Sequence, residues 1–69
     1  MSELALTVNG EARRVPAPAT VADLLAGLGL DARAVVVEVN RRIVRRQQVA
    51  DTPLESGDVV ELVHFVGGG

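Results

Sequence analysis

The chain has 69 residues, nine acidic and seven basic side chains and a formal net charge of −2, so we expect one small domain without the basic surface of a general nucleic-acid-binding protein. With no Cys and a single His, a disulfide, a thiolate zinc site and most other metal sites are excluded. No signal peptide is evident and no apolar run approaches the roughly 20 residues of a membrane span, which favours a soluble cytoplasmic protein with no membrane partner.

The N-terminal region has the pattern of a β-hairpin. Large apolar side chains alternate from Leu4 to Val8, which predicts a strand with one buried face. Asn9-Gly10 follows and favours a tight hairpin turn. We expect Glu11 to Val15 to return as an edge strand, because its Arg and Glu side chains discourage pairing with other chains. Pro16 ends this strand, since proline has no N–H to donate.

A short amphipathic helix is expected next. Thr20 is a suitable N-cap, and Asp23 three residues later completes a capping box. The helix should extend for about nine residues and end near Gly29, which suits the left-handed C-cap position. Its apolar side chains recur at helical spacing and form one stripe that faces a core: Val21, Leu24, Leu25 and Leu28.

A second strand pair follows the helix. The β-branched residues from Val35 to Val39 predict a strand, Asn40-Arg41 a tight turn, and Arg42 to Val44 a short returning strand. This short strand lies within a cluster of four arginines, Arg41, Arg42, Arg45 and Arg46. Two interpretations of the cluster stay open, which are a solvated sheet edge and a docking patch for an acidic partner.

The last strand is apolar on both faces. The segment from Thr52 to Asp58 predicts a turn or a short 3₁₀ helix before it. By the two-residue period, Val60 and Leu62 share the covered face with a structural, partly buried His64. The opposite face carries Val59, Val63 and Phe65. A monomer cannot easily hide this second apolar face, which points to a partner.

This order of elements predicts an α+β domain with the β-grasp (ubiquitin-like) arrangement. The expected fold is a mixed sheet of about four to five strands with one helix packed across one face. Its first and last strands would pair in parallel at the centre. We expect residues 1–66 to form the domain and residues 67–69 a flexible C-terminal glycine tail. The predicted core is Leu4, Leu6, Val8, Val21, Leu24, Leu25, Leu28, Val37, Val39, Leu54, Val60 and Leu62.

Over its whole length the chain resembles the ubiquitin-like sulfur carrier proteins of thiamine biosynthesis, the ThiS family. Each matching segment is weak alone, and their order, the total length and the terminal glycines make the resemblance strong. Asn40-Arg41 departs from the Asn-Gly that family members often have, which affects the turn and not the chemistry. The segments are Leu6 to Glu11, Thr20 to Leu25, Val37 to Asn40, Thr52 to Val63, and Val66-Gly67-Gly68-Gly69.

The resemblance implies a carrier that binds no cofactor or metal and is acted on by partner enzymes. An E1-like adenylyltransferase would use ATP to join AMP to the carboxylate of Gly69. Sulfur from a persulfide donor would displace the AMP, leave a thiocarboxylate and pass to thiazole synthase. Gly67 and Gly68 would thread into the partners' active sites. The implied partner-binding face is Val59, Val63, Phe65 and Val66.

Three other functions stay open. The chain could serve another sulfur pathway, as the small subunit of molybdopterin synthase does, although its short length favours the thiamine type. It could be a ubiquitin-like protein modifier that joins Gly69 to a lysine. It could also be a passive β-grasp interaction module, against which the acidic balance and the glycine tail count.

Overall fold

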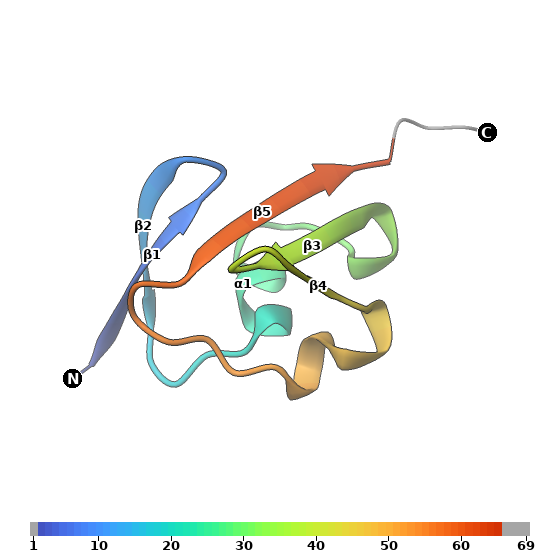
Figure 1. Ribbon diagram of the computed structural model, residues 1–69. Coiled ribbons are helices and arrows are strands. Elements are labelled where there is room, and N and C mark those ends of the chain that lie inside the picture. Colours follow the sequence, from blue (N-terminus) through green and yellow to red (C-terminus); the bar gives the residue numbers. More distant parts are fainter. Residues whose placement is uncertain (1, 66–69) are drawn as a thin grey trace.

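A computed structural model describes residues 2–65 of the chain, so the predicted residues Val66, Gly67, Gly68 and Gly69 lie outside the described part. Five strands form one sheet with the order β2-β1-β5-β3-β4 (Figure 1). In chain order the elements are β1 (Glu3–Val8), β2 (Glu11–Pro16), α1 (Val21–Gly27), the 3₁₀ helix η1 (Ala32–Ala34), β3 (Val35–Val39), β4 (Arg42–Val44), the 3₁₀ helix η2 (Arg46–Asp51) and β5 (Val59–His64).

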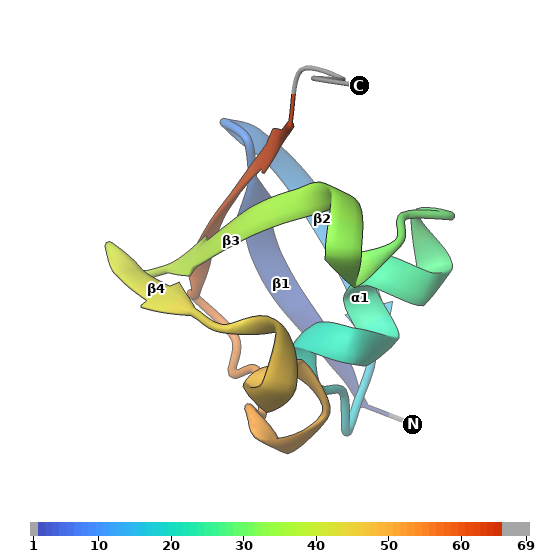
Figure 2. The same ribbon diagram turned by 90° about the vertical axis from the view of Figure 1, so that its right-hand side faces the viewer.

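The predicted β-grasp arrangement is confirmed. β1 pairs in parallel with β5 at the centre, and the other neighbours are antiparallel. β2 is an edge strand, as its charges predicted. α1 lies across one face of the sheet and leaves the other face open (Figure 2). No helix within residues 2–65 is long and apolar enough to cross a membrane.

Helix α1 begins as the sequence predicts and ends earlier. The Thr20 hydroxyl accepts a hydrogen bond from the Asp23 backbone N–H, and the Asp23 carboxylate accepts one from the Thr20 N–H. The helix has seven residues, and not about nine, because Thr20 and Leu28 are its N-cap and C-cap residues. The predicted left-handed cap at Gly29 is confirmed and closes a Schellman motif. Gly29 has φ +71°, and the N–H of Leu30 reaches back to the carbonyl of Leu25 at 2.9 Å.

The core is aliphatic and lies between α1 and the sheet. Nine of the twelve predicted core residues are buried, whereas Leu4, Leu28 and Val39 are half-buried at the margin. Ala19, Val35 and Val49 are buried although they were not predicted. Val49 enters the core because residues 46–51 form a 3₁₀ helix, where the sequence has little periodicity. Of the turn or short 3₁₀ helix predicted for residues 52–58, the turn is confirmed at Ser56-Gly57, where Gly57 has φ +94°.

We predict that Gly27→Ala stabilises the fold by about 0.5–1 kcal/mol. Gly27 lies in the last turn of α1, and a Cβ there would meet no atom within 4 Å. Gly29→Ala is the matched control. A Cβ there is equally unobstructed, but φ +71° disfavours alanine and should cost about 1 kcal/mol. Urea unfolding measures both changes, and shifts in the same direction would contradict the assigned helix end.

Candidate functional site

The turn residue Asn9 extends the sheet along one side of β5. β1 pairs with β5 through only two residue pairs, Thr7 with Val59 and Val8 with Val60. Beyond them the Asn9 backbone N–H donates to the carbonyl of Val60 at 2.9 Å. Its side-chain Oδ1 accepts from the N–H of Leu62 at 2.7 Å, and its Nδ2 donates to the carbonyl of Leu62 at 3.2 Å. One side chain thus supplies the hydrogen bonds that a neighbouring strand would make.

A second turn asparagine, Asn40, holds the start of β5 from the opposite side. Its backbone N–H donates to the carbonyl of Val59 at 2.8 Å, and its Oδ1 accepts from the N–H of Val59 at 2.9 Å. Its Nδ2 donates to Asp58 Oδ1 at 3.0 Å. Asn9 and Asn40 have φ of 50° and 51°, and asparagine is one of the few residues that tolerates this left-handed region.

These contacts fix the course of the chain toward its C-terminus. The last described backbone hydrogen bond joins the N–H of Phe65 to the carbonyl of Ala34 at 3.0 Å. The chain is therefore tied to the sheet up to the residue that precedes Val66. Four further residues reach Gly69, and four residues span at most about 13 Å.

The open face of the sheet presents exposed apolar side chains along β5. Val59, Val63 and Phe65 are 47%, 59% and 61% exposed. Alternation along β4 places Ile43, which is 68% exposed, on the same face. The exposure predicted for the three β5-side residues is confirmed, and Ile43 extends this apolar surface beyond what the sequence predicted.

His64 is exposed, so the prediction of a partly buried structural histidine is wrong. It falls on the helix side of β5 as the period predicts, and it pairs with Val35 at the end of the sheet. α1 ends at Gly27 and does not cover this corner. His64 instead borders an open hollow of about 250 Å³ that Leu28 and Leu30 also line.

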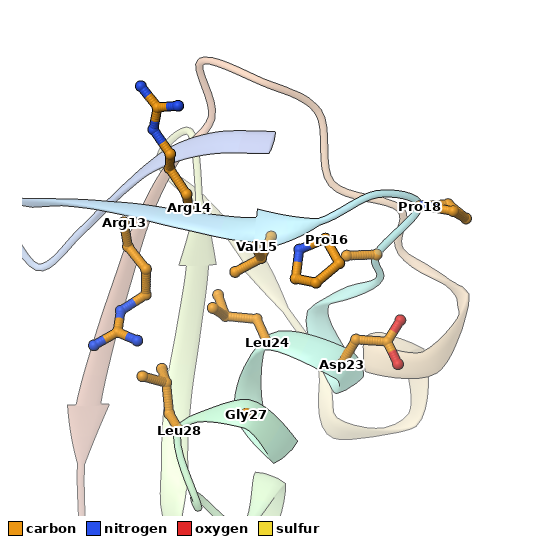
Figure 3. Close-up of a pocket in the computed structure, with 10 residues that line it drawn as sticks. Arg13, Arg14, Val15, Pro16, Pro18, Asp23, Leu24, Gly27 and Leu28 are labelled. Atoms are coloured by element: carbon orange, nitrogen blue, oxygen red, sulfur yellow. The ribbon is translucent and has the colours of Figure 1, made fainter. Parts of the chain in front are cut away.

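A separate groove of about 460 Å³ lies between the edge strand β2 and α1 (Figure 3). Val15, Leu24 and Leu28 point into it, and Arg13 lies at one end. It opens on the helix-covered side of the sheet, away from the exposed apolar surface. No group of three His, Cys, Asp or Glu side chains that could hold a metal ion occurs in residues 2–65.

Comparisons with known proteins agree with this geometry. The ThiS family model matches residues 6–69. The chain is 44% identical over 50 residues to the sulfur carrier protein ThiS of Bacillus subtilis, covering 72% of this chain and 76% of that one. The crystal structure of the thiamine biosynthesis protein ThiS from Geobacter metallireducens superposes with a TM-score of 0.81 at 36% identity, covering 96% of this chain and 100% of that one.

A longer relative links the same region to an enzyme. The chain is 45% identical over 64 residues to the thiazole synthase of Paramagnetospirillum magneticum. The match covers 93% of this chain but only 20% of that protein, so the chain spans about a fifth of the length of this relative. A domain similar to this chain is therefore part of a larger thiazole synthase polypeptide.

The fold defines a β-grasp domain, in which a compact body holds the strand that leads toward the glycines at positions 67–69. The chain belongs to the ThiS family, whose members are sulfur carrier proteins of thiamine biosynthesis.

We predict that Asn9→Gly lowers the free energy of unfolding by about 1–3 kcal/mol, because it leaves both backbone groups of the buried Leu62 without partners. Glycine keeps the left-handed φ, so backbone strain does not contribute. Asn40→Gly is the matched control and should cost about 0.5–1 kcal/mol, since its side-chain hydrogen bonds are exposed. Hydrogen exchange of the Leu62 amide should accelerate in Asn9→Gly, and unchanged protection would refute this role.

We predict that Val63→Asp retains the fold and lowers stability by less than about 1 kcal/mol, since Val63 is exposed. The neighbouring Leu62→Asp should unfold the domain, because it places an unpaired charge in the core. Two-dimensional NMR spectra and urea unfolding distinguish these outcomes. An unfolded Val63→Asp would mean that the face assignment on β5 is wrong.

Proposed function

We propose that the Gly69 carboxylate is the group on which this protein carries sulfur, and that the carried sulfur is used by thiazole synthase to form the thiazole of thiamine. Family membership over residues 6–69 is the observation that carries this proposal. The anchored β5 supports it as well, because a fixed strand delivers the segment that follows it to a constant place on the surface.

The chemistry requires an activated carboxyl group. A free carboxylate resists nucleophilic attack because its charge is delocalised and oxide is a poor leaving group. A partner adenylyltransferase of the E1 type would join the Gly69 carboxylate to AMP and release pyrophosphate from ATP. The terminal sulfur of a persulfide donor would then displace AMP and form an acyl disulfide. Reduction of its S–S bond by a thiol would leave Gly69 as a thiocarboxylate. ATP is used by the partner, and the carrier itself needs no bound cofactor.

Glycine at residues 67–69 suits entry into a narrow active site. Without side chains, Gly67 and Gly68 would need only a channel as wide as the backbone. On this proposal, residues 67–69 act as a tail that extends from a domain of residues 1–66. The described body then provides recognition, and the partner enzymes provide every catalytic group.

The exposed apolar surface is the proposed docking face. Val59, Val63 and Phe65 are exposed on the open side of the sheet. Val66 lies outside the described residues, and we propose that it also contacts the partner. Burying such side chains against a partner contributes roughly 25 cal/mol for each Å² removed from water. The similarity to a thiazole synthase supports this enzyme as one partner. The cytoplasm, where ATP is available, is the location that fits the proposal.

The direct test is reconstitution with purified partners. Incubation with ATP, the adenylyltransferase and a sulfide source should raise the intact mass by one exchange of oxygen for sulfur. A variant without Gly69 should stay unmodified while its unfolding midpoint is unchanged, because glycine has no side chain to contribute to a core. Sulfur gain in the variant, or no gain in the wild type when an established ThiS protein reacts, would contradict the proposal.

A further inference from the structure

Four arginines surround the short edge strand β4, and the fold divides them between two sides of the sheet. All four are exposed. Within β4, Arg42 and Val44 share the helix side and Ile43 lies on the open side. Arg41 and Arg45 flank the strand on either side, and Arg46 begins η2. We call Arg41, Ile43 and Arg45 the β4 stripe.

Two hollows show which residues lie beside these arginines. Arg45 and Ile43 line a shallow hollow of about 320 Å³ together with Val36 and Phe65, and Arg33 and Arg46 line it as well. Arg41 lines a second hollow, of about 410 Å³, with Val59 and Glu61. Arg42 instead lines a hollow with Pro53 and Thr52. The β4 stripe therefore adjoins the exposed apolar residues of β5.

The arginines of the β4 stripe make no ion pair with residues 2–65. The ion pairs in this part of the chain join Arg14 to Glu3 and Arg33 to Asp31. The pair at Arg33 is close, at 2.8 Å, and hydrogen bonds from Arg33 lower the pKa of the Asp31 carboxyl to about 2. Arg33 is thus neutralised at the surface, whereas Arg41 and Arg45 keep charges that are free to meet a partner.

Arg41 occupies a backbone conformation that disfavours it. Its φ is +70° in the second position of the β3–β4 turn, where glycine is the favoured residue. Because the backbone at Arg41 is strained and the residue is still a charged arginine, we look for a role of its side chain.

We propose that the β4 stripe docks on carboxylate groups that border an apolar patch of thiazole synthase. This inference rests on the proposed function and adds the chemistry of the partner. Exposed Ile43 and Phe65 between arginines favour a protein surface, since protein interfaces are enriched in aromatic residues and arginine. The guanidinium group binds a carboxylate through two parallel hydrogen bonds.

The acidic residues of the open face orient this contact. Glu38 and Glu61 lie directly opposite each other in β3 and β5 and would repel a partner's carboxylates. We therefore place those carboxylates on the β4 side of the two glutamates, next to Arg45 and Arg41. Attraction on β4 and repulsion over the β3–β5 pair together define one orientation of the partner on this face.

The test compares two charge reversals on the same strand region. Calorimetry measures binding of each variant to the purified thiazole synthase of the same organism. Arg45→Glu should weaken binding by at least about tenfold and reduce its salt dependence. Arg42→Glu has the same change in charge on the other side and should alter affinity by less than about twofold. Equal losses in the two variants, or no loss in Arg45→Glu, would overturn the proposal.

Arg41→Gly separates binding from folding. Glycine relieves the left-handed turn, so the thermal midpoint should rise by about 4 °C, whereas affinity for thiazole synthase should fall. Unchanged affinity would contradict a role of Arg41.

A short RNA serves as a control for a different kind of partner. The proposal would also be overturned if the wild type bound this RNA, Arg45→Glu did not, and both bound thiazole synthase equally well. Sulfur gain on the wild type tests the proposed function independently of these results.

Discussion

The central strand β5 forms fewer backbone hydrogen bonds to its neighbouring strands than its position suggests. Two asparagines, Asn9 and Asn40, supply further hydrogen bonds to it. β1 pairs with it only as far as Val60, after which Asn9 provides a donor and an acceptor to Leu62. At the start of the strand, the side-chain Oδ1 of Asn40 accepts from the N–H of Val59, and the backbone N–H of Asn40 donates to the Val59 carbonyl. The strand that leads to the glycine terminus is consequently fixed on both sides. The proposed function requires this constraint, because partner enzymes would have to find the Gly69 carboxylate at a constant distance from the proposed docking face.

Elements with a clear period were predictable from the sequence. Both the first strand and the helix occur where expected, because each pattern is set by residues close together in the sequence. These patterns are the alternation from Leu4 to Val8 and the apolar stripe of Val21, Leu24 and Leu25. Two features depend on contacts that a local pattern does not encode. Residues 46–51 lack a period and still form a 3₁₀ helix that buries Val49. His64 has the period of a covered residue, but the helix ends too early to cover it.

The site was predictable in part, for the same physical reason. Exposure of Val59, Val63 and Phe65 follows from a strand that is apolar on both faces with one helix to cover it. The Asn-Gly signal located the first turn but not the role of Asn9, which joins residues 53 positions apart. Likewise, four arginines in sequence could not reveal that Arg41 and Arg45 adjoin the exposed apolar residues of β5, because that depends on how β4 pairs with β3.

The central claim is that a rigid body presents the Gly69 carboxyl group for sulfur transfer. This claim can be tested directly in the cell. Protein purified from its native host during thiamine synthesis can be cleaved, and its C-terminal peptide sequenced by tandem mass spectrometry. The account predicts a peptide that ends at Gly69, part of which carries sulfur in place of one terminal oxygen. A peptide that continues beyond Gly69, or one that ends there without any sulfur in actively synthesising cells, would contradict it.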